Sequence, residues 1–462
     1  MNLTEPIVAA FVRGDSAEAM RLLRDSNAHT PQSIADRERL LRFATLLEAT
    51  RVARGRGDHA RTVALAREGV DLALRLEPPE RARLMQVLPG LLIEWSRDIR
   101  EDFDLRTRHA LLDRAYAWAM SCRDDRAAAI AAGELAADRA FTGRTEEATI
   151  WLDRSRWLAD AAGLGETSRA RLATALLASS RLDFAGAVRI VESLLPKGGT
   201  VGPHLLPPRV MRAIWTAQLR PELLPSLIAD LESLLAAAPW PPLSRAYVTM
   251  SIARLHLRSG RPERAIPLLD PREAGALRPM LLVHRSAAHL ARGDFHAAEL
   301  DATEAADTPD SWPRIRTEMG ALAAVARLRL QDAKGAAERF RDAVAQAEIH
   351  DSPIGLTVIS SADLGRLAEL AYGSEVPPIV RTVREAALPD PAGPPRTHRI
   401  TEKESRLLHT LLEHPDLRVQ ELAAHLEVSP NTIKTQLGSL YRKAGVSSRA
   451  QLLRAARTRL EL

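Results

Sequence analysis

The chain has 462 residues, of which 46% are hydrophobic and only 4% aromatic, and its formal net charge is +5. This length exceeds one ordinary globular core, and the abundance of alanine, leucine and arginine favours helices over strands. A single cysteine, Cys122, excludes an internal disulfide and a cysteine zinc cage. We therefore predict an all-α protein of two or more units, or one elongated array, in which Cys122 is a small apolar filler.

The amino terminus shows no targeting signal, because residues 1–11 lack a basic start followed by an apolar run. The longest apolar stretch, from Leu84 to Trp95, contains Pro89 and Gly90 and is too short to span a bilayer. We expect a soluble, cytoplasmic protein with no membrane partner.

Short polar turns of similar composition recur along the first three quarters of the chain, at intervals of roughly 33 to 46 residues. Each turn follows one apolar helical stretch and precedes another, so it ends one helix and caps the next. One helix pair cannot bury its apolar stripe alone, and stacked pairs form a superhelix. The turns lie near Gly14, Gly57, Gly143, Leu182, Pro221, Gly260, Gly293 and Gln331, with a weaker one near Phe103.

This pattern resembles the tetratricopeptide-like family of helical repeats over about residues 1–375. The resemblance implies a superhelix whose concave face binds a peptide, protein or small-molecule effector. We predict a sensor or interaction domain over residues 1–387. Five tryptophans either line its groove or, as we favour, pack between helices: Trp95, Trp118, Trp151, Trp157 and Trp215.

The segment "LPDPAGPPRTHR", residues 388–399, carries four prolines and a glycine. Proline removes a backbone donor and breaks helices, so we predict a semi-rigid linker here. A second domain follows over residues 400–462.

Four helices are predicted in this second domain. The first, in "ITEKESRLLHTLLEHPD", is capped by Thr401 with Glu404 completing a capping box. A short second helix in "VQELAAHLEV", a tight turn from Glu427 to Ser429 and a longer third helix make a helix-turn-helix. The fourth helix lies in "SSRAQLLRAARTRL" and is capped by Ser447 or Ser448.

The third helix, "SPNTIKTQLGSLYRKAGV", has clear end signals, because Ser429 is the N-cap, Pro430 takes the first helical position and Gly445 closes the end. The spacing predicts one buried stripe formed by Ile433, Leu437, Leu440 and Ala444. The opposite face carries Lys434, Thr435, Gly438 and Arg442. Such a helix enters the major groove of DNA with its amino-terminal end first.

The segments "ITEKESRLL" and "ELAAHLEVSPNTIKTQLGSLYRKAGVSSRAQL" closely resemble the DNA-binding domain of the LuxR family of bacterial regulators, over about 60 residues. The resemblance implies that the third helix reads bases and that the fourth supports dimer contacts. The base-facing positions are then Lys434, Thr435 and Gly438, where glycine removes one possible base contact. Phosphate partners are Asn431, Thr432, Arg442 and Lys443, and candidate dimer contacts are Leu452, Leu453 and Arg457.

The net positive charge of the chain comes from its carboxyl-terminal part. Residues 396–462 contain 12 basic and 7 acidic residues, whereas the remaining chain has 52 of each. A neutral body with a basic tail indicates that the tail meets a polyanion. Lysine at position 434 can donate to guanine, and Thr435 can contact a thymine methyl group.

Motifs for catalysis and cofactor binding are missing from the sequence. The glycines of "PKGGT", residues 196–200, lack the spacing of a phosphate-binding loop. Three histidines, His409, His414 and His425, have no cysteine or carboxylate cluster around them. We expect no enzyme activity, no cofactor and no metal, so the chain resembles the last two parts of large ATP-binding LuxR-family regulators without their ATPase.

Together these features predict a bacterial DNA-binding transcription regulator, dimeric on near-palindromic double-stranded DNA and controlled by an effector on the array. It would be nucleoid-associated when bound. The alternative is a protein-interaction scaffold whose carboxyl-terminal domain serves dimerisation or docking. The thin reading face at Gly438 favours that alternative, and the retained basic residues argue against it.

Overall fold

The computed structural model describes residues 21, 42–43, 45–50, 52–53, 58–75, 88–99, 105–196, 206–237, 240, 242–272, 277–306, 312–392, 402–444 and 448–460. The chain divides into two compact units, Met1–Ala392 and Gly393–Leu462. Every regular element in the described ranges is helical, which confirms the all-α prediction. No helix in these ranges has the length and apolar character needed to cross a membrane.

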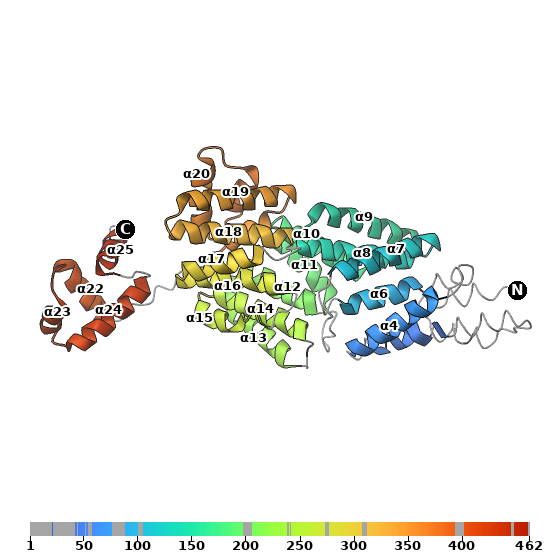
Figure 1. The fold of residues 1–462 in the computed structure, drawn as a ribbon, viewed down its shortest axis with the longest axis horizontal. Helices are drawn as coiled ribbons and strands as arrows, with labels where there is room; N and C mark the ends of the chain where they lie inside the picture. Colours follow the sequence, from blue (N-terminus) through green and yellow to red (C-terminus); the bar gives the residue numbers. More distant parts are fainter. Residues whose placement is uncertain are drawn as a thin grey trace, which may run out of the picture. The chain divides into compact units, whose positions relative to one another are not determined.

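The first unit, hereafter the repeat unit, is a succession of antiparallel helices (Figure 1). Its first half contains α4 (His59–Leu74), α6 (Leu88–Ile99), α7 (Leu105–Ser121), α8 (Asp125–Thr142), α9 (Thr145–Ala161), α10 (Ser168–Ser180), α11 (Phe184–Leu194) and α12 (Leu206–Leu219). Its second half contains α13 (Leu224–Ala236), α14 (Pro242–Arg258), α15 (Pro262–Ala265), α16 (Arg278–Arg292), α17 (Phe295–Ala306), α18 (Pro313–Arg329), α19 (Ala333–Ile349), α20 (Ser361–Tyr372) and α21 (Pro378–Glu385). Short 3₁₀ turns occupy Pro221–Leu223, Ile266–Leu268 and Pro353–Val358.

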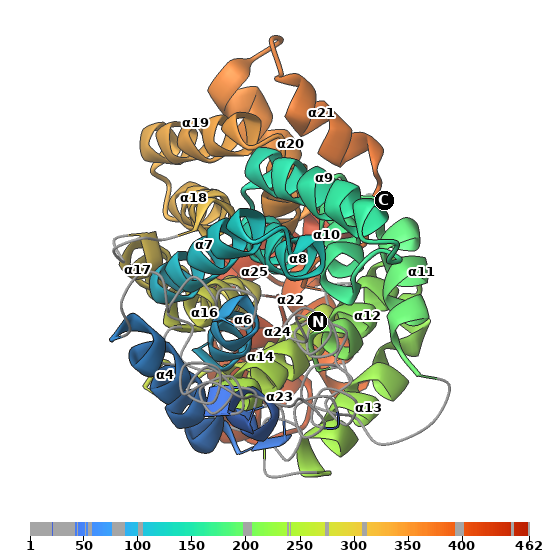
Figure 2. The ribbon, with the colours of Figure 1, turned by 90° about the vertical axis from the view of Figure 1, so that its right-hand side faces the viewer.

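Helices of the repeat unit alternate between an inner and an outer layer. Figure 2 shows α8, α10, α12, α14, α16 and α18 toward the middle, with α9, α11, α13, α17 and α19 outside them. Alanine dominates where the layers meet, and Ala128, Ala173 and Ala324 have no exposed surface. Small side chains let neighbouring helices approach closely, which is why an alanine-rich sequence stacks in this way. We call the surface of the six middle helices that faces the centre of the ring the inner face.

Three of the predicted turns between helices share one local arrangement. Residues in the left-handed conformation end helices at Leu182 (φ 68°), Gln331 (φ 70°) and Gly293 (φ 86°), each at a predicted turn. The next residue is an aspartate. The Asp183 carboxylate accepts from the Gly186 N–H at 2.8 Å, and equivalent caps occur at Asp58, Asp124 and Asp332. Backbone geometry and capping chemistry therefore act together at these turns. The turns near Gly14, Gly57 and Phe103 fall outside the described residues.

The two ends of the inner layer meet. A Cβ on Gly143, after α8, would lie 2.9 Å from the Cβ of Arg314 on α18. The Thr145 hydroxyl donates to the carbonyl of His350, 205 residues away in sequence. The Phe141 ring packs edge-on against Trp312, with 5.6 Å between ring centroids. The array therefore completes one turn and closes on itself.

Part of the predicted linker belongs to the repeat unit. Leu388 packs against the core of α8 to α12, and Ala392 packs against the core of α14 to α21. The Ala392 N–H donates to the Asp390 carboxylate at 2.9 Å. Residues 393–401, which include the predicted cap Thr401, lie outside the described residues. The three predicted segment boundaries stay a prediction, but residues 388–392 are held by the array.

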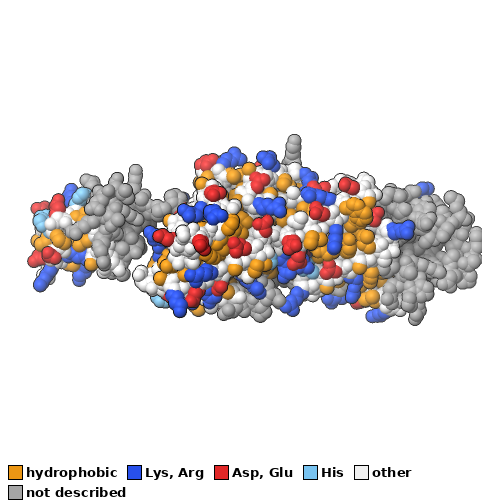
Figure 3. All heavy atoms as spheres, turned by 90° about the horizontal axis from the view of Figure 1, so that it is seen from above, with side chains coloured by type: hydrophobic (Ala, Val, Ile, Leu, Met, Phe, Trp, Pro, Cys, Tyr) orange, Lys and Arg blue, Asp and Glu red, His pale blue; other side chains and the backbone are white. Residues whose placement is uncertain are grey.

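The tryptophans do not share one location. Trp215 is 5% exposed and lies in the core, and Trp151 packs edge-on against Tyr116 with centroids 5.1 Å apart. Trp157 is 66% exposed, and the Trp95 side chain lies outside the described part of the chain. No common groove joins the described tryptophans. Acidic and basic side chains intermix over the face of the repeat unit seen in Figure 3, as expected of a solvated helical surface.

Candidate nucleic-acid interface

The second unit contains four helices around one apolar core. They are α22 (Glu402–Glu413), α23 (Val419–His425), α24 (Pro430–Ala444) and α25 (Arg449–Leu460). The core draws leucines from all four helices and includes Ile433, Leu437 and Leu440 of the predicted buried stripe, with Ile433 at 0% exposure. Its members are Leu407, Leu411, Leu422, Ala423, Ile433, Leu437, Leu440 and Leu452. This core fixes the orientation of α24, because three of its members lie on that helix.

The turn between α23 and α24 is set by backbone geometry. Glu427 takes the left-handed conformation with φ 53°, and the Val428 N–H donates to the Ala423 carbonyl at 3.0 Å. The Ser429 hydroxyl accepts from the Thr432 N–H at 3.1 Å, as the predicted N-cap. A tight turn followed by a capped helix holds α23 and α24 in the angled arrangement of a helix-turn-helix.

The outer face of α24 carries the predicted DNA-contacting residues. Asn431, Lys434, Thr435 and Gly438 are exposed, whereas Thr432 is partly buried with its hydroxyl 2.8 Å from that of Ser429. The Thr435 hydroxyl donates to the Asn431 carbonyl at 3.0 Å. A Cβ added at Gly438 would meet no atom within 4 Å, so the surface there is open. The helix thus presents one basic and polar strip, which Gly438 interrupts because it has no side chain.

Three further predicted residues, Arg442, Lys443 and Arg457, have side chains outside the described part of the structure, although their backbones lie in α24 and α25. Leu452, a candidate dimer contact in the sequence analysis, lies inside the domain. Its side chain is only 2% exposed because it fills the core of its own domain. Leu453 is partly buried at the edge of the same core.

Sequence reasoning missed two features of this unit. The Arg449 guanidinium donates to the carbonyls of Leu417 and His414, which ties the start of α25 to the loop after α22. Val428 is 37% exposed directly before α24, so an apolar side chain lies at the end of the helix expected to enter the groove. No periodicity argument could find either, since both depend on contacts between helices.

Three histidines of this unit, His409, His414 and His425, are not gathered at one place. The rings of His414 and His425 meet edge-on with centroids 5.7 Å apart, and His409 is exposed elsewhere on α22. Within the described ranges, no three histidine, cysteine or carboxylate side chains are grouped so that they could hold a metal ion.

Comparison with known proteins identifies the second unit. Residues 398–456 match the family model described as bacterial regulatory proteins, luxR family. No curated protein matches the chain.

Two solved structures resemble the chain only weakly. One is titled "Crystal structure of APC/C hetero-tetramer Cut9-Hcn1", with 11% identity, 88% of this chain and 99% of that chain covered, and a TM-score of 0.24. The other is titled "Circular tandem repeat protein with novel repeat topology and enhanced subunit contact surfaces", with 19% identity, 93% and 96% coverage, and a TM-score of 0.15. The description of the repeat unit therefore depends on its own helices and not on these two structures. Residues 398–456 form a helix-turn-helix domain of the luxR family of bacterial regulatory proteins.

Proposed function

We propose that this protein is a sequence-specific transcription regulator that inserts α24 into the major groove of DNA. A domain of the luxR family supports DNA-binding transcription regulation in general. The observation that carries the proposal is the orientation of α24, which buries Ile433 and exposes Lys434 and Thr435. A helix oriented in this way by its own core can approach base edges without unfolding any part of the domain.

Base reading is assigned to Lys434 and Thr435. A lysine ammonium donates to the guanine O6 and N7 acceptors, and a threonine contacts a thymine methyl group. Exposed Val428 adds an apolar surface beside them. Gly438 offers no side chain, so readout at its position depends on close approach of the backbone.

Register on the duplex is assigned to contacts with phosphates. Asn431 and Thr432 lie in the first turn of α24, where the positive end of the helix dipole adds to their attraction for an anion. Arg442 and Lys443 follow near its end. The excess of basic residues in residues 396–462 provides the sequence-independent part of the affinity.

The proposed active form is a homodimer on near-palindromic sites. Two recognition helices related by a twofold axis meet half-sites about one DNA turn apart. Because Leu452 is occupied in the core, contacts from α25 would fall to Leu453 and Arg457. An effector bound to the repeat unit would control this dimer, and the chain would act in the cytoplasm, without enzyme activity.

The test is selection of random double-stranded DNA with the purified full-length protein, followed by sequencing of the bound pool. We expect one near-palindromic motif. The Lys434→Ala variant should lose the motif preference, whereas Lys403→Ala, an exposed lysine on α22, should keep it. Absence of any enriched motif at low salt would contradict the proposal and favour a docking scaffold.

A further inference from the structure

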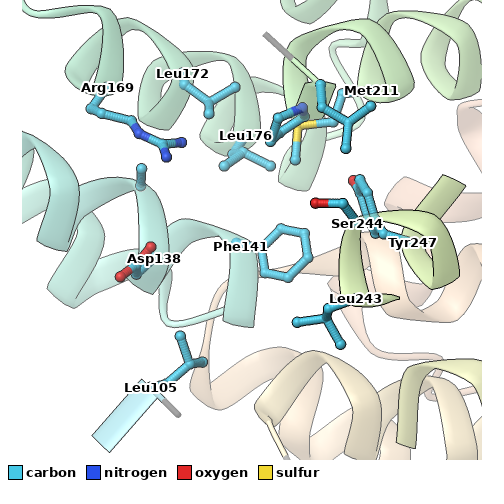
Figure 4. A pocket seen from close by; sticks show the side chains of 13 residues that line it. Leu105, Asp138, Phe141, Arg169, Leu172, Leu176, Met211, Leu243, Ser244 and Tyr247 are labelled. Atoms are coloured by element: carbon cyan, nitrogen blue, oxygen red, sulfur yellow. The ribbon is translucent and has the colours of Figure 1, made fainter. Parts of the chain in front are cut away.

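A cavity lies between the inner helices α8, α10, α12 and α14 of the repeat unit (Figure 4). Most of its lining is apolar, from Phe141, Leu172, Leu176, Met211 and Leu243. Its volume is about 80 Å³, roughly half that of an apolar protein cavity that binds benzene. A space of this size suits an apolar group of about three or four carbon atoms.

Arg169 is the only cation among the described residues that line the cavity. It lies on α10, its side chain is 15% exposed, and Figure 4 shows its guanidinium directed toward the cavity. Its Nε lies 3.0 Å from the Glu134 carboxylate, and the described part of the chain accepts no hydrogen bond from its terminal nitrogens. A mostly buried guanidinium therefore has donors left for a ligand that enters the cavity.

The two carboxylates of this region are already engaged. Glu134 Oε2, which faces the Nε of Arg169, also accepts from Arg108 Nη2 at 2.7 Å. Asp138, another residue of the lining, accepts from Arg108 Nε at 2.5 Å, and His109 lies 3.6 Å from it. Arg108 is fully buried, so these bonds are part of the fold. An acid group paired with the terminal nitrogens of Arg169 would come from a ligand.

The apolar lining begins directly beside this cation. Leu172 and Leu176 follow Arg169 on α10 at intervals of three and four residues, so the three side chains share one side of the helix. All three line the cavity. Figure 4 shows the Phe141 ring across from Leu176, with Tyr247 at the end of the cavity away from Arg169. A ligand held at Arg169 would extend along α10 toward Phe141.

We propose that this cavity binds a short-chain carboxylate, with its acid group paired to the terminal nitrogens of Arg169 and its alkyl tail among Leu172, Leu176 and Phe141. The planar fork of a guanidinium matches a carboxylate in geometry and charge. Burial of the tail adds to the affinity.

The site also connects distant parts of the repeat unit. Its lining joins α8 and α10 to α14, so a bound acid would contact helices from both halves of the unit. A role for the acid as the effector of the regulator rests on the proposed function. Binding of the acid to the cavity does not depend on it.

The experiment is isothermal titration calorimetry of the full-length protein with pentanoate. We expect saturable 1:1 binding with a dissociation constant of about 1 mM or lower. Acetate, which lacks the tail, and pentanamide, which lacks the charge, should each bind at least about fivefold more weakly. Pentylamine carries a positive charge and should show no saturable binding.

Each probe has an outcome that contradicts one part of the site. Equal binding of acetate would overturn the apolar part, and equal binding of pentanamide would overturn the anionic part. Binding of pentylamine in place of pentanoate would overturn the whole proposal and indicate a ligand held by the Asp138 carboxylate.

Variants of Arg169 locate the acid group. Arg169→Gln should weaken pentanoate binding at least about tenfold, and Arg169→Lys should retain part of the affinity, because lysine keeps the charge and loses the fork. Arg171→Gln, on the same helix but outside the lining, should bind pentanoate like the unaltered protein. Circular dichroism should show that Arg169→Gln folds, because Glu134 keeps its bond to Arg108.

Chain length tests the position of the tail. Leu176 is 4% exposed and lines the cavity, so Leu176→Ala enlarges the space. This variant should bind heptanoate more tightly than pentanoate, whereas the unaltered protein should prefer pentanoate. Leu177→Ala, at a 6% exposed position outside the lining, removes a similar side chain and should keep the original order. An unchanged order in the Leu176 variant would overturn the proposed direction of the tail.

The proposal as a whole is overturned if pentanoate does not bind, or if Arg169→Gln binds it as tightly as the unaltered protein. None of these measurements uses DNA. Failure here therefore leaves the proposed DNA reading intact, and failure of DNA selection leaves this site intact.

Discussion

The two units use their charged side chains in opposite ways. In the repeat unit, Arg108 is fully buried, and its guanidinium donates to Asp138 at 2.5 Å and to Glu134 at 2.7 Å. In the second unit, the basic side chain of Lys434 is exposed on α24. Arg108 therefore holds helices together inside the repeat unit, whereas Lys434 faces outward from the second unit.

The difference between a buried, paired arginine and an exposed lysine indicates where a partner can bind. An arginine with two buried carboxylates has no interaction left to offer, whereas an exposed lysine on a helix with an apolar core remains available. The following predictions test this contrast, from the largest expected effect to the smallest.

Replacing Arg108 with methionine should destabilise the repeat unit by about 3–5 kcal/mol. The change leaves Glu134 and Asp138 buried with fewer partners. Chemical denaturation followed by circular dichroism measures the loss. Arg144→Met, which breaks the exposed pair with Glu147, should cost under ~1 kcal/mol. Similar losses in both variants would show that the buried network contributes no more than a surface pair.

Replacing Leu411 with alanine should destabilise the second unit by about 2–5 kcal/mol, because a fully buried core side chain is lost. DNA binding should fall with it, while most of the helical signal, which comes from the repeat unit, should persist. His409→Ala, an exposed position on the same helix, is the control. Simultaneous melting of the whole chain in the Leu411 variant would contradict the independence of the two units.

Acid should weaken the repeat unit through Asp138. Burial alone would raise the pKa of this carboxyl, but Arg108 and His109 lower it to about 2. A carboxyl pKa depressed from about 3.9 stabilises the fold at higher pH, and this contribution is lost as pH falls from about 4 to about 2.

In Asp138→Asn, the free energy of unfolding should therefore depend less on pH across that interval, by about 2–3 kcal/mol. Denaturant titrations at several values between about pH 5 and about pH 2 measure how the free energy of unfolding depends on pH. Asp153→Asn, at an exposed position on α9, should keep the original slope. An unchanged slope in the Asp138 variant would place the acid sensitivity elsewhere.

Replacing Lys434 with alanine should weaken specific DNA binding by about 1–3 kcal/mol without lowering the melting temperature. The exposed side chain contributes nothing to the core, so affinity and stability should separate. Fluorescence anisotropy on the selected site gives the affinity, with Lys403→Ala as control. A matched loss of stability would mean that Lys434 supports the fold instead of the contact.

Replacing Gly438 with alanine should stabilise the second unit by up to about 1 kcal/mol, because glycine is a poor helix former. A Cβ there meets nothing within 4 Å, so no steric penalty offsets the gain. Thermal unfolding measures the effect. If stability rises while DNA affinity falls, close backbone approach at Gly438 is part of the reading face.

Local signals in the sequence predicted the helix ends well. Asp183 and Asp332 each follow a turn residue with positive φ and cap the next helix, because this chemistry involves neighbours only. The exposed strip of α24 was predictable for the same reason, since the period of the apolar stripe leaves one face outward. Leu452 shows the limit: its burial in the domain's own core depends on how α25 crosses the other helices, and the sequence pattern did not predict it.

The sequence by itself determined the all-α class, the hairpin repeats and the helix-turn-helix, because each follows from interactions among residues close in the chain. Only the tertiary structure decided the closure of the array at Thr145 and His350 and the packing of Leu388 and Ala392 against the array. These features depend on small rotations between successive hairpins, which accumulate along the array. No local pattern in the sequence determines the total of these rotations, so the closure of the array could not be predicted from the sequence.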